Sequence, residues 1–357
     1  MNDPHYVRLL MDIGSAEHTS VLRTLRDQIH ERMEAMLPSL PVEQFYKQLN
    51  EAHDALVRRV IRLAEAETAR LGMGSPPVPY AYLLFGSGGR KEQTLSSDQD
   101  SGIVYEDPVP GADRAAIEQY YQFLSGMVVE KLQEVGYPPC EGNVLSSNPQ
   151  WCMAIGNWQN QMDGWLEDPE FEVVRYLLII ADGRVVAGDE RLLERIKTRF
   201  MSDLLNKPLI ARRMLENTMR HKVLLGVFGQ LLKEQYGEES GSVDIKYGAY
   251  IPMVNAIRLL ALQNAISETS TLERIEALYE RKAIGGSERA VYRDTFRLFL
   301  QFRLMTMELM EDGMYTSNGK LAGRKLTKET KEQLKGGLRI GRKLQKHVEK
   351  QTLRKFR

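Results

Sequence analysis

Apolar residues recur at helical spacing near both ends of the chain. Over residues 20–70 they fall three or four positions apart, with one interruption at 37–41, where two prolines break the pattern. The run 72–79 is rich in glycine and proline, which a helix does not tolerate. From Glu190 onward helical periodicity returns, with breaks such as 236–244. We therefore predict helices on both sides of a central region of different character.

The central region alternates short apolar runs with polar stretches. Residues 80–85, 99–105 and 173–181 are rich in aromatic and β-branched residues and predict strands, whereas residues 120–135 have helical spacing. This mixture favours an α+β fold with a mixed sheet. The predicted domains are a helical segment at 1–75, a mixed-sheet domain at 76–190 and a helical domain at 191–357.

Composition excludes several classes of protein. Of the 357 residues 43% are hydrophobic, which is enough for sizeable cores, and Lys+Arg and Asp+Glu number 48 each. The two cysteines, Cys140 and Cys152, are too few for a disulfide framework or a thiolate zinc cluster. No run reaches the roughly 18 apolar residues of a membrane helix. The N-terminus lacks a basic-then-apolar signal pattern, so we expect a cytoplasmic protein without a membrane partner.

The neutral total conceals one basic segment. Residues 320–357 contain 14 Lys+Arg and 3 Asp+Glu, so the remainder of the chain carries an excess of 11 negative charges. We favour the solvated face of a terminal helix packed on an acidic body. Binding of RNA or another polyanion stays open, although the near absence of aromatic residues there argues against base stacking.

The stretch from Gly86 to Asp100 carries the most chemical information. It reads Gly-Ser-Gly-Gly-Arg-Lys-Glu-Gln-Thr-Leu-Ser-Ser-Asp-Gln-Asp and begins where a predicted strand ends. Small residues let backbone N–H groups approach an anion closely, which favours phosphate binding. The order of residues matches neither a Walker P-loop nor a dinucleotide-binding fingerprint.

Asp98 and Asp100 stand two apart at the start of a predicted strand. Because side chains alternate along a strand, both carboxylates should lie on one face, with Cα atoms roughly 6.5–7 Å apart. Carboxylate oxygens suit Mg²⁺. A phosphate-binding turn followed by a metal-binding pair is the layout that phosphoryl or nucleotidyl transfer requires. A surface loop with two solvated aspartates is the alternative.

These residues resemble a known family. Gly86-Ser87 followed by Asp98-x-Asp100 is similar to the hallmark of the polymerase-β-like nucleotidyltransferase superfamily. The full string resembles the DUF294 branch, which is related to the N-terminal catalytic region of protein-PII uridylyltransferase. The resemblance continues in Ser147-Asn148-Pro149-Gln150-Trp151 and in Val243-Asp244-Ile245-Lys246, and so covers most of the chain.

The resemblance implies a third catalytic carboxylate. Asp182 with Arg184 resembles the Asp-x-Arg element of these enzymes, although Gly183 replaces the usual apolar residue between them. Asp182-Gly183 is also a good hairpin signal, so a turn aspartate is the alternative.

The implied enzyme uses an NTP and Mg²⁺ or Mn²⁺. Asp98, Asp100 and Asp182 would bind the metal ions and carry out catalysis, and Lys246 could contact the nucleotide or form an ordinary ion pair. The acceptor would be a protein or small molecule, with a regulatory protein partner and a homodimer as further expectations. The nucleotide and phosphate-binding residues would be Gly86, Ser87, Gly88, Gly89, Arg90, Lys91, Arg184 and Lys246.

Two further interpretations follow from the same residues. A protein that senses a nucleotide in the same cleft without turning it over is the alternative function. The dyad His53-Asp54 is present in the sequence, but the chain lacks the further spaced His and Asp ligands of a phosphohydrolase. We therefore interpret His53 as a surface or helix-packing residue.

Overall fold

The computed structural model describes residues 4–226, 229–237, 239–310 and 314–356, and the chain divides into two compact units. The first unit contains residues 1–164 and 182–199, and the second contains residues 165–181 and 200–357. The chain crosses between the units within two helices and once more directly after Ala181. Among the described residues no helix has both the length and the apolar character that crossing a membrane requires.

The first unit is built on a mixed four-stranded sheet of order β3-β2-β1-β4. β1 pairs antiparallel with β2 and β4, and β2 pairs parallel with β3. β1 and β2 are buried along their full length, as expected of continuous apolar runs in central strands. The strands are β1 (Tyr80–Leu84), β2 (Ser101–Tyr105), β3 (Cys152–Ala154) and β4 (Arg184–Gly188).

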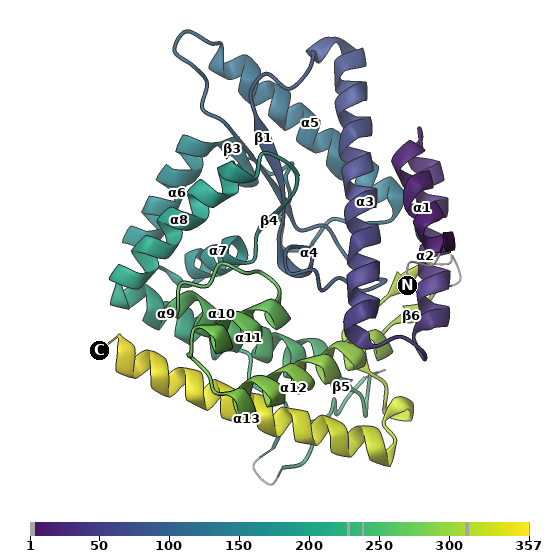
Figure 1. The fold of residues 1–357 in the computed structure, drawn as a ribbon, viewed down its shortest axis with the longest axis vertical. Coiled ribbons are helices and arrows are strands. Elements are labelled where there is room, and N and C mark those ends of the chain that lie inside the picture. The colour runs from purple at the N-terminus through teal and green to yellow at the C-terminus, as the bar shows by residue number, and fades with distance from the viewer. Residues whose placement is uncertain (1–3, 227–228, 238, 311–313, 357) are drawn as a thin grey trace. The chain divides into compact units, whose positions relative to one another are not determined.

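Long amphipathic helices complete this unit. α3 packs against α2, α5 and β4, and Figure 1 shows α1 and α2 beside α3. The predicted break at 37–41 separates α2 from α3, and the predicted helix at 120–135 lies within α5. The helices are α1 (Pro4–Ser15), α2 (Thr19–Met36), α3 (Val42–Thr68), η1 (Ala69–Met73), α4 (Gly86–Gly89), α5 (Arg114–Val135), η2 (Pro149–Trp151), α6 (Ile155–Glu167) and α8 (Glu190–Asn206), of which α6 and α8 extend into the second unit.

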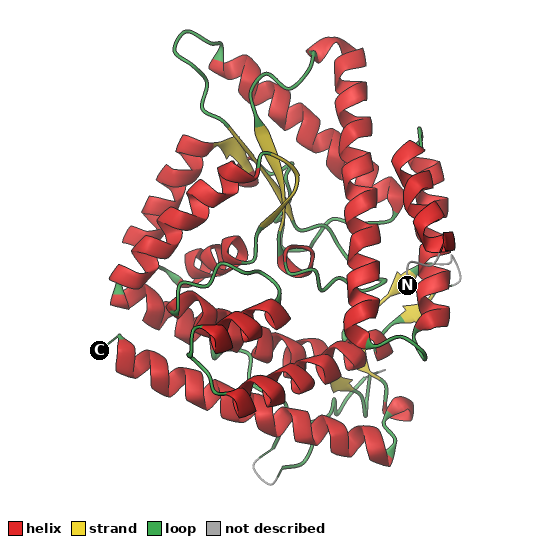
Figure 2. Ribbon diagram, in the orientation of Figure 1, coloured by secondary structure: helices red, strands yellow, loops and turns green. Residues whose placement is uncertain are grey.

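The second unit consists of helices with short two-stranded ladders (Figure 2). α10 is buried over nearly its whole length and packs against α9, α11 and α13. The elements are α7 (Phe171–Ala181), α9 (Pro208–Thr218), β5 (Val243–Asp244), η3 (Lys246–Tyr250), α10 (Ile251–Gln263), α11 (Thr271–Glu280), α12 (Gly286–Met305), β6 (Glu308–Leu309), β7 (Tyr315–Thr316), β8 (Lys320–Leu321), η4 (Gly323–Lys325) and α13 (Lys328–Lys355).

The α+β class and the mixed sheet are confirmed, whereas two local predictions are wrong. Residues 173–181 form helix α7 rather than a strand, because Val174, Leu177, Leu178 and Ala181 share one buried helical face. The predicted helicity after Glu190 also fails over residues 220–235, whose described members contain no helix, whereas the predicted break at 236–244 and the return of helices from α10 onward hold. The division at residues 75 and 190 stays a prediction.

Candidate functional site

The glycine-rich segment forms a single helical turn, α4, directly after β1. The turn is closed by hydrogen bonds from Gly89 N to Phe85 O (2.7 Å) and from Arg90 N to Gly86 O (3.2 Å). Gly86 has a φ of +52°, and a Cβ there would overlap the Asp100 carboxylate. A Cβ on Gly89 would overlap the backbone oxygen of Asp182. The absence of side chains thus lets two of the predicted acidic residues lie against this turn.

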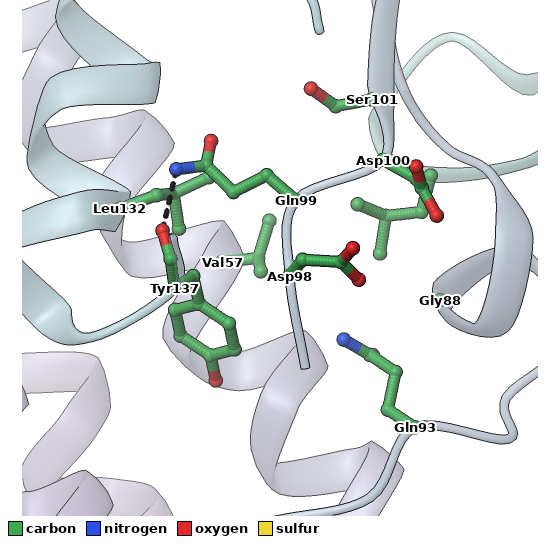
Figure 3. Close-up of a pocket in the computed structure, with 10 residues that line it drawn as sticks. Val57, Gly88, Gln93, Asp98, Gln99, Asp100, Ser101, Leu132 and Tyr137 are labelled. Carbon is green, nitrogen blue, oxygen red and sulfur yellow. Dashed lines mark hydrogen bonds between the residues drawn. The ribbon is translucent and has the colours of Figure 1, made fainter. Parts of the chain in front are cut away.

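Asp98 and Asp100 point to the same side of the chain, as the sequence predicted. Between them Gln99 points the other way, donating from Nε2 to the carbonyl oxygens of Val129 (3.1 Å) and Tyr137 (2.7 Å). Figure 3 shows both carboxylates directed toward Gly88 and α4. Asp98 is exposed and Asp100 is half-buried, so both are open to a ligand from solvent.

A small cavity lies at these carboxylates. Its volume is about 20 Å³, which is room for one water molecule or one small cation. Gln93, which is not among the residues predicted from the sequence, also lines it. The lining residues are Val57, Leu84, Gly88, Gln93, Asp98, Gln99, Asp100, Ser101, Leu132 and Tyr137.

Asp182 lies on the other side of α4 and is enclosed. Its carboxylate is 1% exposed and accepts a hydrogen bond from Arg90 Nη1 at 2.7 Å. Arg90 Nε also donates to Glu92 at 2.8 Å, so the guanidinium lies between two buried carboxylates. Asp182 is not one of the described residues that line the cavity. Asp182 lies in the short connection between the end of α7 and the start of β4, and so it is not itself part of a strand.

Arg184 supports the glycine turn from behind. It donates from Nε to the carbonyl oxygen of Gly88 (2.8 Å) and forms a two-pronged ion pair with Asp54 of α3 (2.5 and 2.9 Å). Asp54 is thereby engaged in the ion pair, and His53 next to it is buried, which agrees with the helix-packing interpretation of the His53-Asp54 dyad.

The remaining predicted residues lie in different settings. Ser87 is half-buried in α4, and Lys91 is exposed with a φ of +55°. Lys246 belongs to the second unit, where its ammonium group lies 5.2 Å from the centre of the Tyr247 ring. Its nucleotide-binding role, like the roles of the other site residues, stays a prediction.

Three side chains from α2 and α3 hold the loop between α4 and Asp98. Asn50 accepts from Gln93 N (3.1 Å) and donates to Gln93 O (3.3 Å), and His53 Nε2 donates to Thr94 O (3.1 Å). Arg26 donates to Leu95 O at 3.4 Å. Three consecutive residues of the loop are therefore fixed by helices that lie far earlier in the sequence.

Burial keeps His53 neutral at neutral pH. Because Nε2 donates to Thr94, the neutral ring accepts at Nδ1 from the Tyr137 hydroxyl, at 2.6 Å. Burial is the main cause that lowers the pKa of His53 to about 3, and the charge of Arg26 lowers it further. The helical spacing around His53 predicts a packing residue, and nothing in the sequence links it to Thr94.

Cys140 neighbours the aspartate pair, and its surroundings favour the protonated thiol. Burial and then the negative charge of Asp100 raise the pKa of its thiol to about 12, and Asp98 contributes in the same direction. The thiol therefore stays protonated near neutral pH.

The donor atoms suit a hard divalent cation. Asp98 and Asp100 offer carboxylate oxygens beside a cavity of ionic size, which is the ligand type that Mg²⁺ and Mn²⁺ prefer. Within the described ranges no cluster of three or more His, Cys, Asp or Glu side chains could hold a metal ion. The protein would therefore supply two acidic ligands, and further oxygen ligands must come from other groups.

The glycine turn after β1 is followed by two aspartates that point to one side of the chain just before β2, which begins at Ser101 and not at the predicted residue 99. This is the order of elements that the resemblance to nucleotidyltransferases implies. The family model described as "Putative nucleotidyltransferase DUF294" matches residues 20–172. The model described as "Putative nucleotidyltransferase substrate binding domain" matches residues 208–352. The chain belongs to the DUF294 family, which confirms the resemblance seen in the sequence. No curated protein matches the chain.

The matched ranges include some of the candidate residues and omit others. The first contains α4, Asp98 and Asp100, together with Asn50 and His53. Asp182 and Arg184 fall between the two ranges, so membership of the family adds nothing to the interpretation of these two residues.

Proposed function

We propose that the chain is a divalent-metal-dependent nucleotidyltransferase that moves UMP or AMP from an NTP to a hydroxyl group of a protein or small molecule. The observation that supports this most directly is the shared cavity of Asp98, Asp100 and the glycine turn. A site with exposed carboxylates and a small-residue turn can hold a metal-bound triphosphate.

Each residue has a proposed role. Asp98 and Asp100 hold Mg²⁺ or Mn²⁺, which neutralises charge on the triphosphate. Ser87 and the Gly86–Gly89 backbone bind the β- and γ-phosphates, and Lys91, which is exposed, approaches the pyrophosphate. Arg90 and Arg184 are bound to Asp182 and Asp54, so we assign them to holding the turn in shape.

The reaction balances without a covalent enzyme intermediate. The acceptor oxygen attacks the α-phosphorus, the bond from this phosphorus to the bridging oxygen breaks, and pyrophosphate leaves with that electron pair. The acceptor proton passes to water. Asp182 acts here as a positioning residue through Arg90, and its direct ligation of a metal ion stays a prediction from the family resemblance.

The biological setting is proposed from the resemblance to protein-PII uridylyltransferase alone. We infer a regulatory modification of a protein acceptor, because that relative modifies a signalling protein. The shared fold does not by itself carry the function over.

Transfer of label from each of the four α-³²P NTPs, with Mg²⁺ or Mn²⁺, into a bacterial lysate tests the proposal. Asp98→Asn/Asp100→Asn should abolish labelling. The matched control, Asp12→Asn/Asp168→Asn, makes the same charge change at two exposed aspartates and should retain it. Labelling that survives the loss of Asp98 and Asp100 would refute the proposed site.

One observation favours a nucleotide sensor as the second candidate. The Asp182 carboxylate is enclosed by Arg90, so two acidic side chains rather than three face the cavity. A sensor would bind an NTP in a calorimetric titration but transfer no label. The transferase proposal predicts both binding and transfer.

A further inference from the structure

Gln93 lies in the loop between the glycine turn and Asp98, and its main chain is fixed on both sides. Asn50 Oδ1 accepts from the Gln93 backbone N–H, and Asn50 Nδ2 donates to its carbonyl oxygen. Asn50 is itself buried in α3 and also donates to Tyr46 O at 2.9 Å. The position of the Gln93 side chain is therefore set by a helix and not by a free loop.

The carboxamide of Gln93 is presented to the cavity of Asp98 and Asp100. The residue is 4% exposed and lines that cavity (Figure 3). Its Oε1 is buried and has no hydrogen-bond partner in the described part of the chain. A buried acceptor without a donor is unfavourable unless a water molecule or a cation binds it.

We propose that the Gln93 carboxamide oxygen is the third protein ligand of the divalent cation held by Asp98 and Asp100. Amide oxygens are ordinary ligands of hard cations, and the cavity has room for one such ion. The inference rests on the proposed function for the presence of a cation at this pair. The described residues provide no third His, Cys, Asp or Glu side chain at this pair, so a further protein ligand must be of another type, and the Gln93 amide oxygen is such a group.

Binding requires only a rotation of the amide group. Figure 3 shows the carboxamide nitrogen facing Asp98. A half-turn about Cγ–Cδ exchanges the nitrogen for the oxygen. In the described residues this breaks no side-chain hydrogen bond of Gln93, because only its backbone atoms are engaged. Asn50 is then a positioning residue, since it fixes the backbone from which the side chain reaches the ion.

Mn²⁺ binding followed by electron paramagnetic resonance tests this without relying on activity. Gln93→Met keeps the length of the side chain and removes the oxygen, so we expect Mn²⁺ affinity to fall about tenfold or more. Gln93→Glu restores an oxygen at the same place and should bind Mn²⁺ at least as tightly as the wild type. Gln133→Met, at an exposed position on α5, serves as the control and should change nothing.

Two outcomes would overturn the assignment. One is Gln93→Met binding Mn²⁺ within twofold of the wild type while thermal unfolding shows it folded. The other is Gln93→Glu losing affinity as Gln93→Met does, which would mean that the site needs the amide N–H. Asp98→Asn/Asp100→Asn separates this question from the proposed function. If the double aspartate variant retains Mn²⁺ affinity, the metal site of the proposed function is wrong. If the double aspartate variant loses affinity while Gln93→Met retains it, only the Gln93 assignment fails.

Discussion

The two sides of the glycine turn treat their carboxylates in opposite ways. On one side Asp98 is exposed and Asp100 half-buried beside a cavity of ionic size. On the other side Asp182 is enclosed and bound to Arg90. A carboxylate open to water can exchange a ligand, whereas a buried one must keep a fixed partner, because an unpaired buried charge is very unfavourable. The comparison shows that α4 has an open acidic side and an enclosed, ion-paired side.

The largest expected effect is on stability and comes from the enclosed side. Asp182→Asn leaves the buried Arg90 without one of its carboxylate partners, so we expect the free energy of unfolding to fall by about 3 kcal/mol. Chemical denaturation measures this. Asp163→Asn, which breaks the exposed pair with Arg199, should cost less than about 1 kcal/mol. Equal losses for the two variants would contradict the division between the sides.

Two glycines of α4 allow each side to be disturbed separately. Gly86→Ala places a Cβ against the Asp100 carboxylate at a positive φ, so transferase activity should fall about 100-fold. Gly89→Ala places a Cβ against the backbone of Asp182, so its main effect should be on thermal stability.

Gly126→Ala, in an open position on α5, is the control and should be neutral or stabilising by up to about 1 kcal/mol. Activity assays and thermal unfolding on the three variants measure both properties. If Gly86→Ala retained full activity, Asp100 would not need its present position.

The contact between His53 and the loop that follows α4 should make the free energy of unfolding depend on acid pH. The pKa of His53 is about 3 in the folded protein and 6.5 as the ordinary value, so the unfolded chain binds a proton first as pH falls. Stability from this residue is complete above pH 6.5 and is lost as pH decreases from 6.5 toward 3. Between pH 6.5 and 5.0 the loss is about 2 kcal/mol.

Denaturation curves at several pH values measure this loss. His53→Gln, which retains a donor for Thr94 O, should reduce the slope of stability against pH. Replacement of the exposed His18 by Gln is the control. An unchanged slope in the His53 variant would mean that other groups govern the acid sensitivity.

The smallest effect is expected from exposed basic side chains, in contrast to the buried Arg90. α13 packs in the second unit through its apolar face, while Lys343, Lys346 and Lys350 are exposed. Reversing these three lysines to glutamate should change the free energy of unfolding by about 0.5 kcal/mol or less for each residue. We expect no RNA binding before or after the change. Salt-sensitive RNA binding that the triple reversal removes would instead support the polyanion interpretation.

The part of the site that depends on local chain geometry could be predicted from the sequence. The glycine turn and the one-sided placement of Asp98 and Asp100 follow from neighbouring residues, since the alternation of side chains needs no distant partner. Residues 173–181 show the limit. A short continuous apolar run suits a buried helix as well as a buried strand, and packing against α9 decides for the helix.

What the sequence could not supply are the partners across long distances. The pairing of Arg90 with Asp182 spans 92 positions, and that of Arg184 with Asp54 spans 130. From the sequence alone, each arginine could equally have bound a phosphate, because the sequence shows that the side chain is charged but not which group it contacts. Gln93 was missed for the same reason, since only the position of Asn50 directs it to the cavity.

The hydrogen bonds from Arg26, Asn50 and His53 to residues 93–95 also bear on the order in which parts of the chain can fold during synthesis. During synthesis the chain emerges from its N-terminus, so all three side chains of α2 and α3 leave the ribosome before the loop that they hold. The loop therefore meets its partners as soon as it appears. A chain shortened to begin at residue 76 would contain the whole sheet and both aspartates, yet it would lack the template on which their loop takes its shape.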